Sequence, residues 1–105
     1  MIDYSCVELA EKTEQNAKSL LLLDVRMPGE FKQGRLANSM LIPLHQLHKR
    51  YNEVPKDTCI AIYCRTGHRS SVAQSILEQH GIYNTANMEG GLEQWQEEGR
   101  TICTE

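Results

Sequence analysis

Short hydrophobic runs alternate along the chain with longer stretches in which apolar and polar residues recur at helical spacing. The runs are too short for buried helices, and they predict strands at residues 1–4, 20–25, 39–42, 59–63 and 84–86. Strands that alternate with helices are typical of βαβ units around a mostly parallel sheet. The run 59–63, CIAIY, is apolar throughout and predicts a central strand that is buried on both faces.

The stretches between these runs predict helices and turns. Ser5 and Glu8 form a capping-box pattern at the start of a helix that extends to Asn16. Residues 27–29 break the chain before a brief helical turn that ends at Gly34. Three further helices are each marked by residues that share one face. They are Leu44, Leu47, His48 and Tyr51; Val72, Ala73, Ile76 and Leu77, ended by Gly81; and, after a turn at 89–91, Leu92 and Trp95, ended by Gly99.

The length and charge of the chain narrow the possible functions. Its 105 residues fit one domain spanning residues 1–105. A net charge of -3 argues against general nucleic-acid binding, which needs basic surface to neutralise phosphates. The longest apolar run, 20–23, is too short to span a membrane, and the N-terminus lacks the pattern of a secretory signal. We therefore expect a cytoplasmic monomer that binds neither nucleic acid nor membranes.

The four cysteines are expected to be thiols rather than disulfide partners, because the chain has ample apolar residues and no secretory signal. They form no CxxC pair, so a zinc site is not predicted. Cys59 lies inside the apolar strand 59–63 and is interpreted as a core residue. Cys6 and Cys103 lie near the termini, and an ordinary tail cysteine is favoured for Cys103 over a resolving or acceptor thiol.

Cys64 stands apart, because it follows the buried strand directly in the segment AIYCRTGHRSS. Ligands of open α/β sheets bind beyond the carboxyl ends of the strands. Gly67 permits a tight turn whose amides point inward, and the next helix adds its own unpaired amides. Arg65 and Arg69 also favour the thiolate, so Cys64 is predicted to be an activated nucleophile rather than an inert core cysteine.

Two reactions use a cysteine in such an amide nest, followed in the sequence by an arginine. One is phosphoryl transfer, in which the arginine clamps phosphate oxygens, and the other is sulfur transfer through a cysteine persulfide. Cysteine phosphatases place five residues between the cysteine and the arginine, whereas four separate Cys64 from Arg69. A smaller ring suits a single sulfur better than a tetrahedral phosphate, so this loop size favours sulfur transfer.

Four segments resemble the motifs of the rhodanese domain, of the single-domain thiosulfate sulfurtransferase type. CRTGHRS resembles the catalytic loop of that family, and the others are LLLDVRMPGEFKQGRL, SMLIPL and MEGGLEQWQEEG. They occur in the order of the family and cover nearly the whole chain. The chain departs from the family at Arg35, where histidine is frequent, and at Met27, which replaces a residue that is often polar.

The resemblance implies a three-layer α/β/α fold around a central parallel five-stranded sheet. It also implies that Cys64 takes a sulfane sulfur from a small anionic donor such as thiosulfate and passes it to a thiol, cyanide or a protein thiol. The loop amides would hold the persulfide, and the side chains of Arg65, His68 and Arg69 would attract the donor. The substrate-binding residues so implied are Arg65, Thr66, Gly67, His68 and Arg69. No metal or organic cofactor is implied.

The other polar candidates receive supporting roles. Asp24 and Arg26 follow a buried strand, and an ion pair that braces the loop is favoured over a catalytic role. Ser70, where the helix opens, is grouped with them. His45 and His48 lie one turn apart but lack further ligands, so no metal site is predicted there.

Three functions follow from these observations. A sulfurtransferase with a Cys64 persulfide is favoured. A cysteine phosphatase or arsenate reductase on the same architecture is disfavoured by the short loop. A non-catalytic rhodanese-like module that binds or regulates a partner is disfavoured by the intact cysteine.

Overall fold

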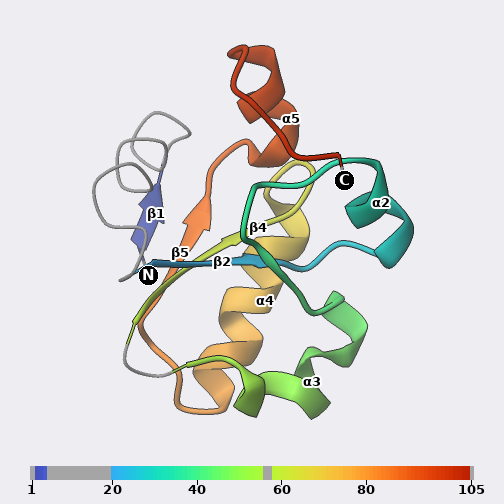
Figure 1. Ribbon diagram of the computed structural model, residues 1–105. Coiled ribbons are helices and arrows are strands. Elements are labelled where there is room, and N and C mark those ends of the chain that lie inside the picture. The colour runs from blue at the N-terminus through green and yellow to red at the C-terminus, as the bar shows by residue number, and fades with distance from the viewer. Residues whose placement is uncertain (1, 5–19, 56–57, 105) are drawn as a thin grey trace.

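The computed structural model of the chain describes residues 2–4, 20–55 and 58–104. Within this part of the chain five strands form one sheet in which every paired strand is parallel, in the order β1-β5-β4-β2-β3 (Figure 1). The strands are β1 Ile2–Tyr4, β2 Leu20–Asp24, β3 Met40–Leu41, β4 Cys59–Tyr63 and β5 Thr85–Met88. The parallel sheet and the central place of the CIAIY strand are therefore confirmed.

The described helices lie between these strands along the chain, except α5, which follows β5. They are α2 Pro28–Gln33, η1 Leu44–Gln46, α3 Leu47–Arg50, η2 Tyr51–Glu53, α4 His68–Gln79 and α5 Gly91–Glu97. The predicted helix 5–16 lies outside the described residues. None of the helices just named is both long and apolar enough to cross a membrane.

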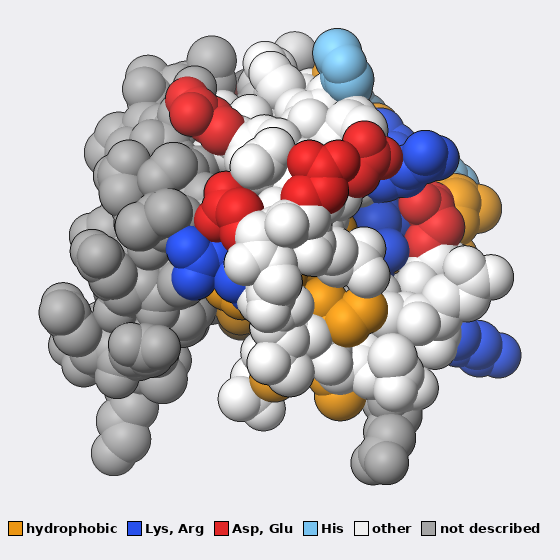
Figure 2. Space-filling view, turned by 90° about the horizontal axis from the view of Figure 1, so that it is seen from above, with side chains coloured by type: hydrophobic (Ala, Val, Ile, Leu, Met, Phe, Trp, Pro, Cys, Tyr) orange, Lys and Arg blue, Asp and Glu red, His pale blue; other side chains and the backbone are white. Residues whose placement is uncertain are grey.

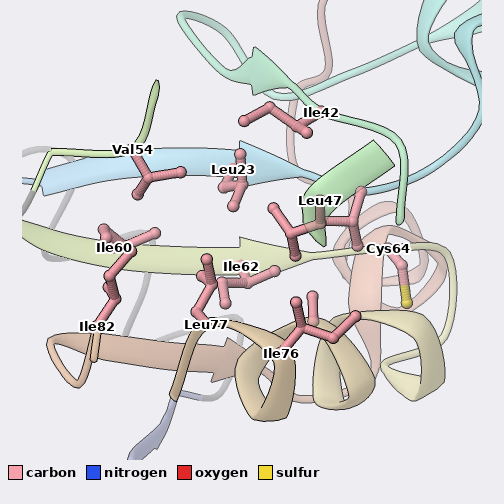
Figure 3. Packing of buried hydrophobic residues seen from close by; sticks show 12 residues of the cluster. Leu23, Ile42, Leu47, Val54, Ile60, Ile62, Cys64, Ile76, Leu77 and Ile82 are labelled. Atoms are coloured by element: carbon pink, nitrogen blue, oxygen red, sulfur yellow. The ribbon is translucent and has the colours of Figure 1, made fainter. Parts of the chain in front are cut away.

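Strand β4 carries the core on both of its faces, because successive side chains of a strand point to opposite sides. Ile60, Ile62 and Cys64 belong to a cluster with α3 and α4 on one face of the sheet. Ala61 and Tyr63 pack on the other face with Leu92 and Trp95 of α5. Figure 3 shows the first cluster between the sheet and α4, with Cys64 at its end. The described helices thus cover both faces of the sheet in a three-layer arrangement.

The buried face of α4 differs from the predicted one at Val72, whose side chain is 51% exposed. The buried positions are Ser70, Ala73, Gln74, Ile76 and Leu77. They follow the helical spacing of three and four residues, but two of them are polar. Ala73, Ile76 and Leu77 are therefore buried as predicted, and only the prediction for Val72 was wrong. The helix also begins at His68, two residues before the serines.

Candidate active site

Cys64 follows β4 at the carboxyl edge of the sheet, and its side chain is turned into the protein, with 1% of the residue exposed. The backbone N–H of Gly67 donates to Cys64 Sγ at 3.0 Å, and Ser70 Oγ lies 3.5 Å from the same sulfur. Gly67 has φ +104°, a left-handed conformation that residues with a Cβ rarely adopt. This conformation turns the 65–67 segment back over the sulfur just before α4 begins.

The surroundings of Cys64 favour its thiolate. Burial raises the pKa of the thiol, but hydrogen bonds from the Ser70 hydroxyl and from the amides of Ser70, Gly67 and Thr66 outweigh it, and the net pKa is lowered. A lowered pKa increases the fraction of the nucleophilic form at neutral pH. The structure therefore holds this thiol inside a cup of backbone N–H donors, as the sequence predicts.

The first turn of α5 holds the loop in this shape. The amide of Leu92 donates to the carbonyl of Cys64 at 2.8 Å, and the amide of Glu93 donates to the carbonyl of Arg65 at 2.9 Å. Two loop carbonyls are thereby bonded to α5, while the neighbouring amides point to the sulfur. Gly91 makes this close approach possible, because a Cβ there would lie 2.5 Å from the carbonyl of Arg65.

Each arginine of the loop forms an ion pair with a carboxylate. Arg69 forms a two-pronged ion pair with Glu30 of α2, with N–O distances of 2.7 and 2.9 Å. Arg65 is paired with Glu93 of α5 at 3.2 Å. The Arg69 guanidinium holds the pKa of Glu30 at about 2. His68 and Thr66 are exposed at the rim.

Asp24 and Arg26 form a buried ion pair below this rim. Asp24 is fully buried, and its carboxylate accepts four hydrogen bonds from the backbone amide and the guanidinium of Arg26 at 2.7–3.0 Å. Arg26 also donates to the carbonyl of Gly34 at 2.6 Å. The pair therefore ties the end of β2 to the end of α2, the helix that carries Glu30.

A cavity of about 420 Å³ opens beside the loop. Its charged lining comes from Arg26, Glu30, Arg65 and Glu93, and Leu92 and Ile102 are among its apolar lining. Figure 2 shows acidic and basic side chains side by side on the face seen from above. The cavity is thus bordered by paired charges rather than by a single sign of charge.

We expect Glu30→Gln to destabilise the fold by about 1 kcal/mol at pH 7, because it removes the charge from a partly exposed ion pair. The folded pKa of Glu30 is about 2, below its ordinary value of 4.5. The pair therefore stabilises the fold fully above pH 4.5, and this contribution is lost as the pH falls through 2. Urea unfolding from pH 7 to pH 3 should show the difference from wild type shrinking below pH 4.5.

Glu53→Gln is the matched control, because Glu53 also pairs with an arginine but is more exposed and lies away from the loop. It should change stability less than Glu30→Gln. The difference in the free energy of unfolding between Glu30→Gln and wild type could instead stay constant to pH 3. That result would show that Glu30 stabilises the fold through packing and not through its charge.

The structure brings together Cys64, Gly67 and Ser70 from the predicted site. It also adds Glu30, Gly91 and Glu93, and Asn87, whose side-chain oxygen accepts a hydrogen bond from Ser70; the sequence interpretation assigned none of them to the site. The segment 89–91 was interpreted only as a turn, although two glycines directly before a helix are a usable sign of close packing.

The other histidines, His45, His48 and His80, lie elsewhere in the structure. His48 Nδ1 and His80 Nε2 are 3.4 Å apart, and the His80 ring stacks on Tyr51. His45 is exposed. Among the described residues no three histidine, cysteine, aspartate or glutamate side chains cluster as metal ligands would.

Comparison with known proteins gives one consistent result. The family model of the rhodanese-like domain matches residues 6–98. A sulfurtransferase of Allochromatium vinosum is 37% identical, over 83% of this chain and 81% of its own. A putative sulfurtransferase of Bacillus subtilis is 30% identical, over 91% of each chain. The solved structure of a rhodanese-related protein from Thermoplasma volcanium matches all of both chains with a TM-score of 0.89 and 34% identity.

Proposed function

The chain belongs to the rhodanese-like domain family, and from this membership and its loop geometry we propose that it transfers a sulfane sulfur through a persulfide on Cys64. The observation that carries the proposal is the Cys64 sulfur itself, held by the Gly67 amide at 3.0 Å in a ring with only four residues before Arg69. Relatives named as sulfurtransferases support a transferase of this family.

The proposed reaction has two steps. In the first, the Cys64 thiolate attacks the outer sulfur of thiosulfate, an S–S bond forms to Sγ, and sulfite leaves with the electron pair of the broken S–S bond. The amides of the loop, which face Sγ, stabilise the anionic persulfide. In the second step, cyanide or a thiolate attacks the terminal sulfur and releases Cys64 as a thiolate.

The geometry does not favour the cysteine phosphatase or arsenate reductase. Phosphoryl transfer needs an arginine that clamps the oxygens of the transferred group. Arg69 instead gives both prongs of its guanidinium to Glu30. The ring is also one residue shorter than in cysteine phosphatases. A non-catalytic binding module would have no use for the cup of donors around the thiol.

Intact-mass measurement tests the proposal directly. After incubation with thiosulfate, the protein should gain the mass of one sulfur atom, located on the peptide that contains Cys64. Cyanide should remove the gain and release thiocyanate. The phosphatase would be favoured if the protein gained no sulfur from thiosulfate, polysulfide or 3-mercaptopyruvate but turned over an aryl phosphate. The absence of both would favour the binding module.

We expect Glu93→Gln to lower the KM for thiosulfate about two- to fivefold, with little change in kcat, because it releases Arg65 from its ion pair at the cavity. The effect should fade as salt is added, since exposed charges are screened. Initial rates with thiosulfate at low and high ionic strength measure it.

Glu97→Gln provides the matched control, because it changes the net charge equally one turn further along α5. It should leave the KM nearly unchanged. Equal effects of the two variants would show that the overall charge of the protein, not the pairing of Arg65, sets the affinity for the donor.

A further inference from the structure

The Ser70 hydroxyl lies between the sulfur of Cys64 and the side chain of Asn87. Ser70 Oγ is 3.5 Å from Cys64 Sγ, and the same hydroxyl donates to Asn87 Oδ1 in a short hydrogen bond. Ser70 is fully buried, and Asn87 lies on β5, the strand beside β4. A second chain segment, 23 residues after Cys64, therefore contacts the thiol through one intermediate side chain.

The number of protons on this hydroxyl limits what Ser70 can do. A serine hydroxyl has one proton to donate and lone pairs with which to accept. While Ser70 donates to Asn87 Oδ1, it acts on Cys64 only as an acceptor, which suits the S–H of a neutral thiol. A thiolate or persulfide anion has no proton, so Ser70 must then donate to sulfur and give up its bond to Oδ1.

The side-chain amide of Asn87 is suited to both states. It has an oxygen that accepts and an NH₂ group that donates, at nearly the same place after a half turn about its last torsion. With the oxygen toward Ser70 it fits the neutral thiol. With the nitrogen toward Ser70 it donates to Oγ, which frees the proton of the hydroxyl for the anionic sulfur.

We propose that Asn87 is a positioning residue, whose amide holds the Ser70 hydroxyl against Cys64 and turns over so that this hydroxyl donates to the anionic sulfur. The proton lost by Cys64 passes to solvent, and the turn of the amide breaks one hydrogen bond and forms another. The inference rests on the proposed function only in taking Cys64 as the reacting thiol. The lowered pKa of that thiol, to which the Ser70 hydroxyl contributes, agrees with it.

Two substitutions separate positioning from mere packing. Asn87→Ala removes the anchor of the hydroxyl. Asn87→Asp keeps the shape, but its carboxylate only accepts, so it binds the proton of Ser70 and withholds it from sulfur. The proposal predicts that the fraction of Cys64 present as thiolate is lower in Asn87→Ala than in wild type, and lower still in Asn87→Asp. A packing role predicts the reverse order, because aspartate fills the space that alanine leaves.

The rate of alkylation of Cys64 by iodoacetamide, followed by peptide mass spectrometry across pH, measures the thiolate without any sulfur donor. At pH 7 the rate should fall about fivefold in Asn87→Ala, the factor expected for one lost hydrogen bond, and more in Asn87→Asp. In a Ser70→Ala background, Asn87→Ala should have no further effect, since Asn87 acts through Ser70. Asn84→Asp, which adds the same charge near the start of β5, should leave the rate unchanged.

Unchanged alkylation profiles in folded Asn87 variants would overturn the proposal. The proposal would also be overturned if Asn87→Ala lowered the alkylation rate equally in the Ser70→Ala background. An effect of Asn84→Asp as large as that of Asn87→Asp would overturn it too. These outcomes are independent of sulfur transfer. A chain that fails to load sulfur but shows the predicted alkylation order would contradict the proposed function and leave the role of Asn87 intact.

Discussion

Cys64→Ser is expected to abolish both the gain of sulfur from thiosulfate and the release of thiocyanate, with a loss of at least about 1,000-fold in turnover. The serine oxygen fits the same site, where it accepts the Gly67 amide, but its proton is not lost at neutral pH and it forms no persulfide. The fold should change in stability by no more than about 1 kcal/mol. Intact mass and urea unfolding of the same sample measure the two effects.

Cys59→Ser is the control, because Cys59 begins the strand that Cys64 follows and is only half-buried. This variant should load and release sulfur like wild type. Loading that persists in Cys64→Ser would contradict the proposal that Cys64 is the carrier, and mapping the modified peptide would then identify which other cysteine holds the sulfur.

The parts of the site that the sequence predicts are those that are continuous along the chain. Strand β4, Cys64, the turn at Gly67 and the start of α4 follow one another within residues 59–70. Hydrophobic runs and turn residues report such local structure directly. The parallel sheet then fixes the edge at which the thiol lies, because the carboxyl ends of all its strands lie along that edge.

The partners of the loop come from distant segments, and local patterns contain no information on them. Glu30 is 39 residues before Arg69, and in the sequence it looks like any surface glutamate. Asn87 is 17 residues after Ser70, inside a strand whose sequence contains no recognisable catalytic or binding motif. The ion pairs also change the interpretation of the arginines, because positive residues near a cysteine were expected to face the anion.

The paired charges around the cavity also bear on substrate choice. Arg65 and Arg69 each bind a carboxylate. In the proposed reaction, most of the attraction for a persulfide would therefore come from backbone amides. Amides bind a small anion through short-range hydrogen bonds with fixed directions, whereas free arginines would attract any anion at a distance. Under the proposed function, such a site would select a donor by its fit to the loop more than by its net charge.

Gly91→Ala is expected to have the largest effect of any glycine substitution near the loop. The new Cβ would lie 2.5 Å from the carbonyl carbon and oxygen of Arg65 and 2.6 Å from the carbonyl oxygen of Cys64, closer than real Cβ contacts allow. Backbone atoms on both sides leave no flexible side chain to move, so α5 must shift. The bonds from the amides of Leu92 and Glu93 to the loop then break, and the loop amides lose their aim at sulfur.

We therefore expect a loss of about 3 kcal/mol in stability and of at least about 100-fold in kcat/KM for thiosulfate, even at a temperature at which the variant is folded. Gly99→Ala separates the clash from backbone strain, because Gly99 also has a positive φ, +75°, but has open space around its Cβ position. It should be destabilised by only about 1–2 kcal/mol and keep its activity. A folded Gly91→Ala with wild-type kcat/KM would show that α5 does not set the shape of the loop around Cys64.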